Sequence, residues 1–539
     1  MRLKNSFLCL LIVVVMALVL GKTTVQAETV DQRPVMLVYD SKNIANHGDL
    51  NLDRCQRLLA SLGLPVETIP LSHYQANTLK DGQYQGVITM VNWGQSRNRN
   101  QAFERDRTAF KGIKLHIGPG LQADERQGLG GTFKTLVHQQ LSGHQGRAVQ
   151  PLSTNQLLLV NVKHAANALS VGWLTSQNHP GTTYSFGVKV ANNGFLPELS
   201  SDGLAITLAG QLITKLFKVP TRLQSPLLTI TGITPYTKSR DLSRLIKQLS
   251  SRGTPFALSI TSVDRNTDLK AFHRYTEVLR LAEKAGGLIF LRPPIETGTQ
   301  RLNEKKLRSV FQTELTSLGA DRVIPAGISA PGYWNRSERR QKAVLSRASH
   351  VILLPDQSQR LEELPVEPEP AVTNSHRFKA GLIGIPLASL DTVAYRSKIK
   401  FVQPTALLVK MPESRTKVDQ LVQHLQDSKL QWFDPVRNHL KTTVKVGSVL
   451  YGYHSGQYFL NHEPITDLDA SRKASSRNDD RITQTSWLNR VIQWQSRMLL
   501  WLLSFLGLIL AILLLIGWRV YQRKFMRSDV KKGGINHFK

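Results

Sequence analysis

Three segments in the second half of the chain place aromatic side chains beside charged and amide groups. They contain Tyr236 (in 231–237), Arg292 and Glu296 (in 292–297), and Tyr333, Trp334 and Asn335 (in 330–336). An aromatic ring can stack on the apolar face of a sugar while neighbouring polar groups bond to the hydroxyls. We therefore predict that these six residues line a saccharide-binding groove; an unused, solvent-covered surface is the alternative.

Repeated strand–helix units are expected to position these segments. Residues 227–260 are typical of a strand, a polar loop, an amphipathic helix and a second strand, with apolar residues at helical spacing from Leu242 to Leu249 and Asp241 as the expected N-cap. Further units follow to about residue 425. Such repetition favours a barrel, and loops at the carboxyl ends of barrel strands carry function.

The same segments resemble motifs of the polysaccharide deacetylase superfamily, in its uncharacterised extracytoplasmic branch. The matching stretches are LTITGITPYT (228–237), GGLIFLRPPIET (286–297) and ISAPGYWNRS (328–337). The resemblance covers roughly Pro226 to Pro435. It implies a deformed (β/α) barrel and, in the family, a divalent metal that activates water for deacetylation.

This chain departs from the family at the positions of the metal-binding and catalytic residues. Thr231 and Gly232 stand where the family has acids, and Arg292 and Glu296 stand where it has histidines. Threonine, glycine and arginine do not replace imidazole or carboxylate ligands. We therefore predict no catalytic residue, no metal ligand and no cofactor. Arg292 and Glu296 could instead form an ion pair.

The first part of the chain is predicted to be a separate α/β domain, residues 28–219. Short apolar strands at 34–40, 64–71, 86–93 and 113–120 alternate with helical segments, which is typical of a doubly wound sheet of the flavodoxin or amidotransferase kind. Asp40, Asn92 and His116 lie near strand ends and could either line a crevice there or cap the strands. Strand patterns from 156 to 190 predict an antiparallel extension.

The two ends of the chain predict export and anchoring. Residues 1–27 are typical of a signal peptide, and 498–518 form an apolar stretch of the length that crosses a bilayer. The basic tail, 519–539, is predicted to be cytoplasmic, with a polar stalk at 466–497 and a barrel domain at 226–465. This predicts a single-pass protein of the bacterial cytoplasmic membrane with its body outside.

The net charge of +30 predicts an affinity for polyanions. Outside the cytoplasm these are envelope polymers and acidic polysaccharides, and nucleic acid is not expected. The leading prediction is a non-catalytic, deacetylase-like protein that binds a cell-envelope or exported polysaccharide, or assists its synthesis or export machinery.

Two alternatives stay open. One is an active carbohydrate esterase with relocated ligands, drawn from Asp264, Asp268, His273 and Glu296. The other is a scaffolding subunit of a membrane complex.

Overall fold

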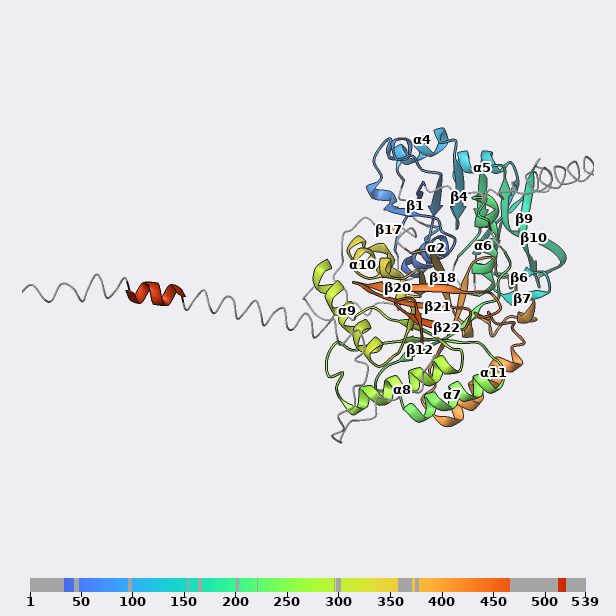
Figure 1. Cartoon of the computed structure of the whole chain (residues 1–539). Coiled ribbons are helices and arrows are strands. Elements are labelled where there is room, and N and C mark those ends of the chain that lie inside the picture. The colour runs from blue at the N-terminus through green and yellow to red at the C-terminus, as the bar shows by residue number, and fades with distance from the viewer. Residues whose placement is uncertain are drawn as a thin grey trace, which may run out of the picture. The chain divides into compact units, whose positions relative to one another are not determined.

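The computed structural model describes residues 33–465 and 512–519. The gaps within the first range are 43–47, 96–98, 153, 155, 163–166, 200–202, 221, 295, 297–301, 357–370 and 374–377. The chain divides into two compact units, Met1–Ser471 and Arg472–Lys539. The first unit is mixed α/β with a closed barrel and a large sheet, and it contains all the elements discussed below except the short helix 512–519 (Figure 1).

The large sheet has ten strands in the order β17-β2-β1-β3-β4-β11-β10-β9-β6-β7. Its parallel part contains β1 (Val35–Tyr39), β2 (Val66–Pro70), β3 (Gly86–Met90), β4 (Ile113–Ile117) and β11 (Asn193–Leu196). An antiparallel part follows, with β10 (His179–Val190), β9 (Ala168–Ser176), β6 (Leu141–Gln145) and β7 (Ala148–Pro151). A separate pair, β5 (Thr132–Val137) and β8 (Gln156–Asn161), lies beside β10.

Helices cover both faces of the parallel strands. Alternate residues of β1 belong to different apolar clusters: Leu37 shares a cluster with residues of α2 (Gly48–Ser61) and α6 (Leu204–Leu216), and Met36 shares one with residues of α3 (Thr78–Asp81) and α4 (Gln101–Ala109). This follows from the two-residue period of a strand, which sends successive side chains to opposite faces. A short helix α5 (Ala123–Leu129) contacts β11.

The closed barrel has seven parallel strands. They are β12 (Leu227–Ile233), β13 (Ala257–Ile260), β14 (Leu288–Leu291), β15 (Pro325–Pro331), β16 (His350–Leu354), β18 (Ala380–Pro386) and β19 (Thr405–Lys410). Pairing of β12 with β19 closes the ring. Both faces of each strand are covered, so β13 and β14 are fully buried; β14 is entirely apolar, and β13 is apolar except for Ser259.

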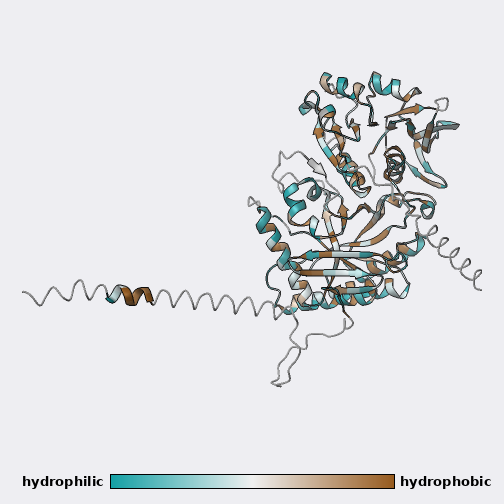
Figure 2. Ribbon diagram, turned by 45° about the horizontal axis from the view of Figure 1, so that its top comes forward, coloured by the Kyte–Doolittle hydropathy of each residue, from teal (hydrophilic) through white to brown (hydrophobic). Residues whose placement is uncertain are grey.

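Amphipathic helices surround the barrel: α7 (Ser239–Ser251), α8 (Lys270–Lys284), α9 (Glu304–Ala320), α10 (Glu338–Ala343) and α11 (Arg415–Asp427). In α7 the buried residues are Leu242, Leu245, Ile246 and Leu249, which lie on one stripe. Figure 2 shows brown strands inside and teal helical faces outside. Helix α7 begins at Ser239, and Lys238 is its N-cap residue. Asp241 therefore lies in the first turn of α7, and the prediction that it is the N-cap was wrong.

A four-stranded sheet covers the amino end of the barrel. It consists of β20 (Lys441–Val446), β21 (Val449–His454), β22 (Gln457–Leu460) and β23 (Glu463–Pro464). Val444 pairs with Ala348, just before β16, and the Tyr458 hydroxyl donates to the carbonyl oxygen of Gly287, just before β14, at 2.7 Å. The carboxyl end of the barrel is left for the loops that the sequence singled out.

Helix α2 lies between the large sheet and the barrel. Eleven of its fourteen residues are buried, because one side contacts β2 and the other contacts β18. The strand β17 (Ala371–Thr373) also joins the two parts, since it pairs antiparallel with β2. Residues 371–373 thus pair with residues 66–68, a segment far away along the chain.

The predicted fold class was wrong in its C-terminal transmembrane helix. Among the residues that the structure describes, no helix is both long enough and apolar enough to cross a membrane. Of the predicted span 498–518, only 512–518 is described, as part of a helix of eight residues (512–519). The signal peptide, the stalk and, except for Arg519, the basic tail lie outside the described residues.

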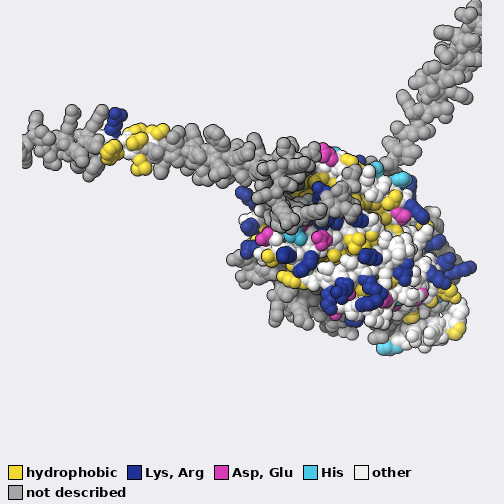
Figure 3. All heavy atoms as spheres, turned by 60° about the horizontal axis from the view of Figure 1, so that its bottom comes forward, with side chains coloured by type: hydrophobic (Ala, Val, Ile, Leu, Met, Phe, Trp, Pro, Cys, Tyr) yellow, Lys and Arg dark blue, Asp and Glu magenta, His cyan; other side chains and the backbone are white. Residues whose placement is uncertain are grey.

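Basic side chains are widespread on the surface. On the face that Figure 3 brings forward, Lys and Arg are scattered among neutral side chains and are more frequent than Asp and Glu, in accord with a chain that has 69 Lys and Arg against 39 Asp and Glu.

Candidate functional site

The carboxyl end of the barrel holds the six residues that the sequence singled out. Tyr236, in the turn after β12, is 93% exposed. Tyr333, Trp334 and Asn335 form a short 3-10 helix, η3 (Gly332–Arg336), directly after β15, and Arg292 follows β14. The barrel topology therefore gathers these loops at one end, but the side chains differ greatly in exposure.

Glu296 is held by two arginines that the sequence analysis did not include. Its Oε1 lies 2.7 Å from Arg339 Nη1, and its Oε2 lies 2.8 Å from Arg340 Nε. Burial acts to raise the pKa of Glu296, but the hydrogen bonds and charges of both arginines outweigh it and lower the pKa. Glu296 is therefore an ionised, paired carboxylate. The Arg-Arg doublet after the third loop was the only sequence signal for this pairing.

Arg340 also covers the aromatic residues of η3. Its guanidinium carbon lies 4.8 Å from the ring centroid of Tyr333 and 5.5 Å from that of Trp334, within the range of cation–π contacts. Trp334 and Asn335 are each 2% exposed. In this structure the indole ring of Trp334 is a core group, and its faces are not open to a ligand.

Arg292 differs from the other charged groups at this end. Its side chain is half-buried, and burial lowers its pKa while the nearby Tyr333 acts in the opposite direction. Within the described part of the chain, no ion pair joins Arg292 to Glu296 or to another carboxylate. The alternative of an Arg292–Glu296 pair is therefore replaced by the Glu296 pairs with Arg339 and Arg340.

The residues that the resemblance aligned with metal ligands have structural contacts of their own. The Thr231 hydroxyl donates to the carbonyl oxygen of Val409 at 3.3 Å, and Gly232 lies where the β12–β13 register shifts. His273, which the esterase alternative would use, has its Nδ1 3.0 Å from Asp321 Oδ2. No cluster of three His, Cys, Asp or Glu suited to a metal ion occurs among the described residues.

A second candidate region lies at the carboxyl edge of the large sheet. Asp40, which follows β1, accepts hydrogen bonds from the backbone N–H groups of Asn92 (2.7 Å) and Trp93 (3.1 Å), just after β3. The Asn92 side chain accepts from Asn51 Nδ2 at 3.2 Å and donates to the Ser41 carbonyl oxygen at 2.9 Å. These bonds fix the turn that presents Trp93, so Asp40 shapes the crevice from behind.

His116 lies beneath this edge in a buried ionic network. Its Nδ1 is 3.0 Å from Glu125 Oε1, and its Nε2 is 3.0 Å from the Pro119 carbonyl oxygen. Burial acts to raise the pKa of Glu125, yet the His116 and Arg107 contacts lower it to about 2. Of the three residues considered for the crevice, only Asn92 lines the hollow; Asp40 and His116 support its walls.

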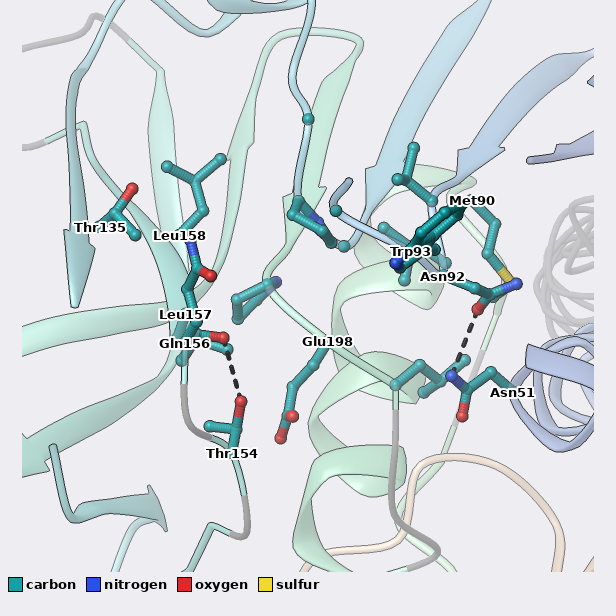
Figure 4. A pocket seen from close by; sticks show the side chains of 18 of the residues that line it. Asn51, Met90, Asn92, Trp93, Thr135, Thr154, Gln156, Leu157, Leu158 and Glu198 are labelled. Atoms are coloured by element: carbon teal, nitrogen blue, oxygen red, sulfur yellow. Dashed lines mark hydrogen bonds between the residues drawn. The ribbon is translucent and has the colours of Figure 1, made fainter. Parts of the chain in front are cut away.

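The hollow itself has a volume of about 770 Å³. In Figure 4, Asn92 and Trp93 form one wall, Thr135, Thr154 and Gln156 lie on the opposite wall, and Glu198 lies between them. Trp93 is 39% exposed. Most groups on the two walls can form hydrogen bonds, and Trp93 adds one aromatic surface.

Sequence reasoning located this edge but missed its most informative side chain. Trp93 ends the segment GVITMVNW, whose strand was predicted, and an aromatic residue at the carboxyl end of a parallel strand was the available signal. The opposite wall comes from β5 and β8, which form a separate pair of strands. Their position against β3 depends on the tertiary fold and carries no local signature.

Comparison with protein-family models gives no match, and comparison with curated protein sequences gives none either.

Proposed function

We propose that this protein binds a cell-envelope or exported polysaccharide, with a deacetylase-like barrel that does not carry out metal-dependent hydrolysis. The observation that carries the proposal is the half-exposed indole of Trp93, which borders a hollow whose other side presents hydroxyl and amide groups. This combination suits a sugar, because the ring face stacks and the hydroxyls form hydrogen bonds.

The place and size of the hollow support this proposal. Ligands of open α/β sheets bind outside the carboxyl ends of the strands, which is where β3, β4 and β11 end. A volume of about 770 Å³ lies within the usual range of small-molecule sites, roughly 300–1,000 Å³. The predominance of polar groups on its walls favours a hydroxylated ligand over an apolar one.

The residues of the barrel loops support the part of the proposal that excludes metal-dependent hydrolysis. The barrel's resemblance to polysaccharide deacetylases rests on three loops, and the ligand positions of that family carry Thr231, Gly232, Arg292 and Glu296 here. Glu296, the one carboxylate of the four, is bound to two arginines. Because both oxygens of this carboxylate are paired with arginines, we assign the loop a structural role.

A binding assay tests the proposed function. The full-length chain is titrated with chitohexaose, a neutral polymer of N-acetylglucosamine, and binding is followed by calorimetry. Trp93→Ala is expected to weaken binding about tenfold through loss of stacking, and Trp93→Phe to retain most of it. Equal affinity of the wild type and Trp93→Ala would contradict the assignment. Chelator-sensitive release of acetate would favour the esterase alternative.

A further inference from the structure

A second hollow lies between the antiparallel end of the large sheet and the barrel. It has a volume of about 670 Å³. Its lining comes from the β6–β7 turn, from β9, from α6 and from the segment before β19, and we call it the basic groove. The residues are Gln145, Gly146, Arg147, Gly172, Trp173, Gln211, Thr214, Lys215, Lys398, Lys400 and Val402.

The two walls of the basic groove are joined by backbone-directed hydrogen bonds. Gln145 Nε2 donates to the carbonyl oxygen of Lys400 at 3.1 Å, and the Lys400 N–H donates to Gln145 Oε1 at 2.7 Å. Nearby, Val149 and Ala394 exchange two backbone hydrogen bonds of 2.8 and 3.1 Å. Because segments about 250 residues apart are joined by four bonds, the groove is built into the fold.

Trp173 supplies an aromatic surface in the basic groove. One side of its indole stacks on His144, with ring centroids 5.2 Å apart and an angle of 10° between the planes. The His144 Nε2 lies 2.8 Å from the Thr175 hydroxyl, which fixes the imidazole. The indole nevertheless keeps 38% of its surface exposed. The Trp173 indole is therefore fixed by His144 on one side and partly accessible to a ligand.

The charge of the basic groove has one sign. Arg147, Lys215, Lys398 and Lys400 line it, and no lining residue is acidic. All four side chains are exposed, and none has an ion pair with a described residue. Four unpaired cations around one hollow attract an anionic ligand.

We infer that the basic groove binds an acidic polysaccharide of the uronic-acid class, whose sugar ring stacks on Trp173 while its carboxylates pair with the surrounding cations. This inference rests on the proposed function and names the charged class of polymer. We infer a charged sugar because Trp173 and the four cations line the same hollow. A polyol-phosphate chain would leave the indole without a ring to contact.

A nucleic acid is a different partner and is the outcome that the test must separate. Single-stranded nucleic acids are bound by grooves in which successive bases stack on several aromatic side chains. The basic groove offers a single indole, already backed by His144. The geometry therefore favours a polymer of pyranose rings with regularly spaced carboxylates.

The test compares ligands of matched length on the full-length chain. Hexagalacturonate is the acidic probe, chitohexaose the neutral probe and a hexathymidylate the nucleic-acid probe. The variant Lys398→Gln/Lys400→Gln removes two of the four cations, each of which would form an exposed ion pair with a ligand carboxylate, and is expected to weaken hexagalacturonate binding about tenfold. The matched control, Lys441→Gln/Lys445→Gln, removes the same charge from exposed positions on β20 and is expected to leave binding unchanged.

A second variant tests the aromatic platform. Trp173→Ala is expected to weaken hexagalacturonate binding about tenfold and to leave chitohexaose binding at the Trp93 hollow intact. Added salt should weaken the acidic probe far more than the neutral one, since exposed ion pairs are screened. If Trp173→Ala fails to fold, the lysine variant and its control still decide the question.

The outcomes separate the two proposals. Two results would contradict the inference that the basic groove binds an acidic polysaccharide: no binding of hexagalacturonate, or an equal loss of affinity in the groove variant and the β20 control. Equal or tighter binding of hexathymidylate with the same variant pattern would replace the saccharide by a nucleic acid. Loss of chitohexaose binding in Trp93→Ala alone would support saccharide binding at the Trp93 hollow, independently of the result for the basic groove. Unchanged chitohexaose binding in Trp93→Ala would contradict only the proposal for the Trp93 hollow.

Discussion

The Arg57 guanidinium, on helix α2, donates a 2.7 Å hydrogen bond to the carbonyl oxygen of Gly384, on the barrel strand β18. The same side chain forms a 2.7 Å ion pair with Asp53, and both groups are almost fully buried. Arg57 therefore links the large sheet's helix to the barrel and neutralises a carboxylate between them. This helix takes a place against β18 that a barrel helix would otherwise occupy.

Replacement of Arg57 by alanine is expected to destabilise the whole described unit. The change removes the nearest cation of the buried Asp53 carboxylate, which among the described residues keeps only Arg336 at 3.9 Å and the Asp356 N–H at 3.4 Å, and the loss costs roughly 3–5 kcal/mol of unfolding free energy. Chemical denaturation checks the value. The control is Arg105→Ala, an exposed arginine on α4, which should change stability by less than about 0.5 kcal/mol. Similar small losses in both variants would contradict this account of the α2–β18 contact.

Glu314, on α9, predicts an unusual dependence of stability on pH. Burial, together with the nearby Asp264, raises the pKa of Glu314 to about 8, and its Oε2 has no hydrogen-bond partner among the described residues. Between the ordinary pKa of a glutamate and pH 8, the folded state binds a proton that the unfolded state has lost. Stability therefore falls as pH rises through that window, by at most about 1.4 kcal/mol per pH unit.

The variant Glu314→Gln removes this titration. Its unfolding free energy should exceed that of the wild type by a margin that grows from pH 5 to pH 8, because glutamine stays neutral. Thermal unfolding at several pH values measures the margin. Glu413→Gln, which changes an exposed glutamate, should show a constant difference from the wild type. A constant difference for Glu314→Gln as well would show that its carboxyl is not protonated in the fold.

Glu296 gives the opposite pH dependence. Its pKa is lowered in the fold by Arg339 and Arg340 despite burial, so its stabilising effect is present above the ordinary pKa of a glutamate and is lost as pH falls below it. Glu296→Gln should lower the unfolding free energy at pH 7 by more than the ~1 kcal/mol ceiling of an exposed pair. Glu304→Gln, which breaks an exposed pair with Arg308, is the control. Equal effects would mean that the Glu296 pairs are not stabilising.

The sequence predicted those helices and strands whose apolar residues recur at helical or strand spacing. The four apolar residues of α7 lie in the buried stripe that their spacing indicated, and the repeated strand–helix units form a closed barrel. The partners of Glu296 could not be predicted in this way, because Arg339 and Arg340 lie 43 and 44 residues further along the chain. No local pattern specifies which of many arginines approaches a given carboxylate.

The candidate sites show the same limit more strongly. The basic groove joins residues near 146, 172, 214 and 400, and each segment alone is an ordinary turn, strand, helix or loop. Their meeting depends on reciprocal bonds such as Gln145 with Lys400, 255 residues apart. The net charge predicted an anionic partner, but only the fold shows where four of the cations converge.

A glycine beneath the Trp93 hollow offers a direct test of how the crevice is shaped. Gly118 has a φ of +99°, and a Cβ at this position would lie 2.1 Å from the carbonyl oxygen of Val91. The turn after β3 would have to move to accommodate it. Because Val91 lies two residues before Trp93, Gly118→Ala is expected to weaken chitohexaose binding about as much as Trp93→Ala and to lower stability.

The matched control is Gly130→Ala, at a left-handed position with a φ of +60° and no atom within 4 Å of a built Cβ. It carries the backbone cost of a left-handed residue, about 1–2 kcal/mol, without the clash against the β3 turn. Calorimetric titration of both variants separates strain from displacement. If Gly130→Ala lost chitohexaose affinity to the same extent, general destabilisation would explain the loss. If only Gly118→Ala lost chitohexaose affinity, the affinity would depend on the position of Trp93.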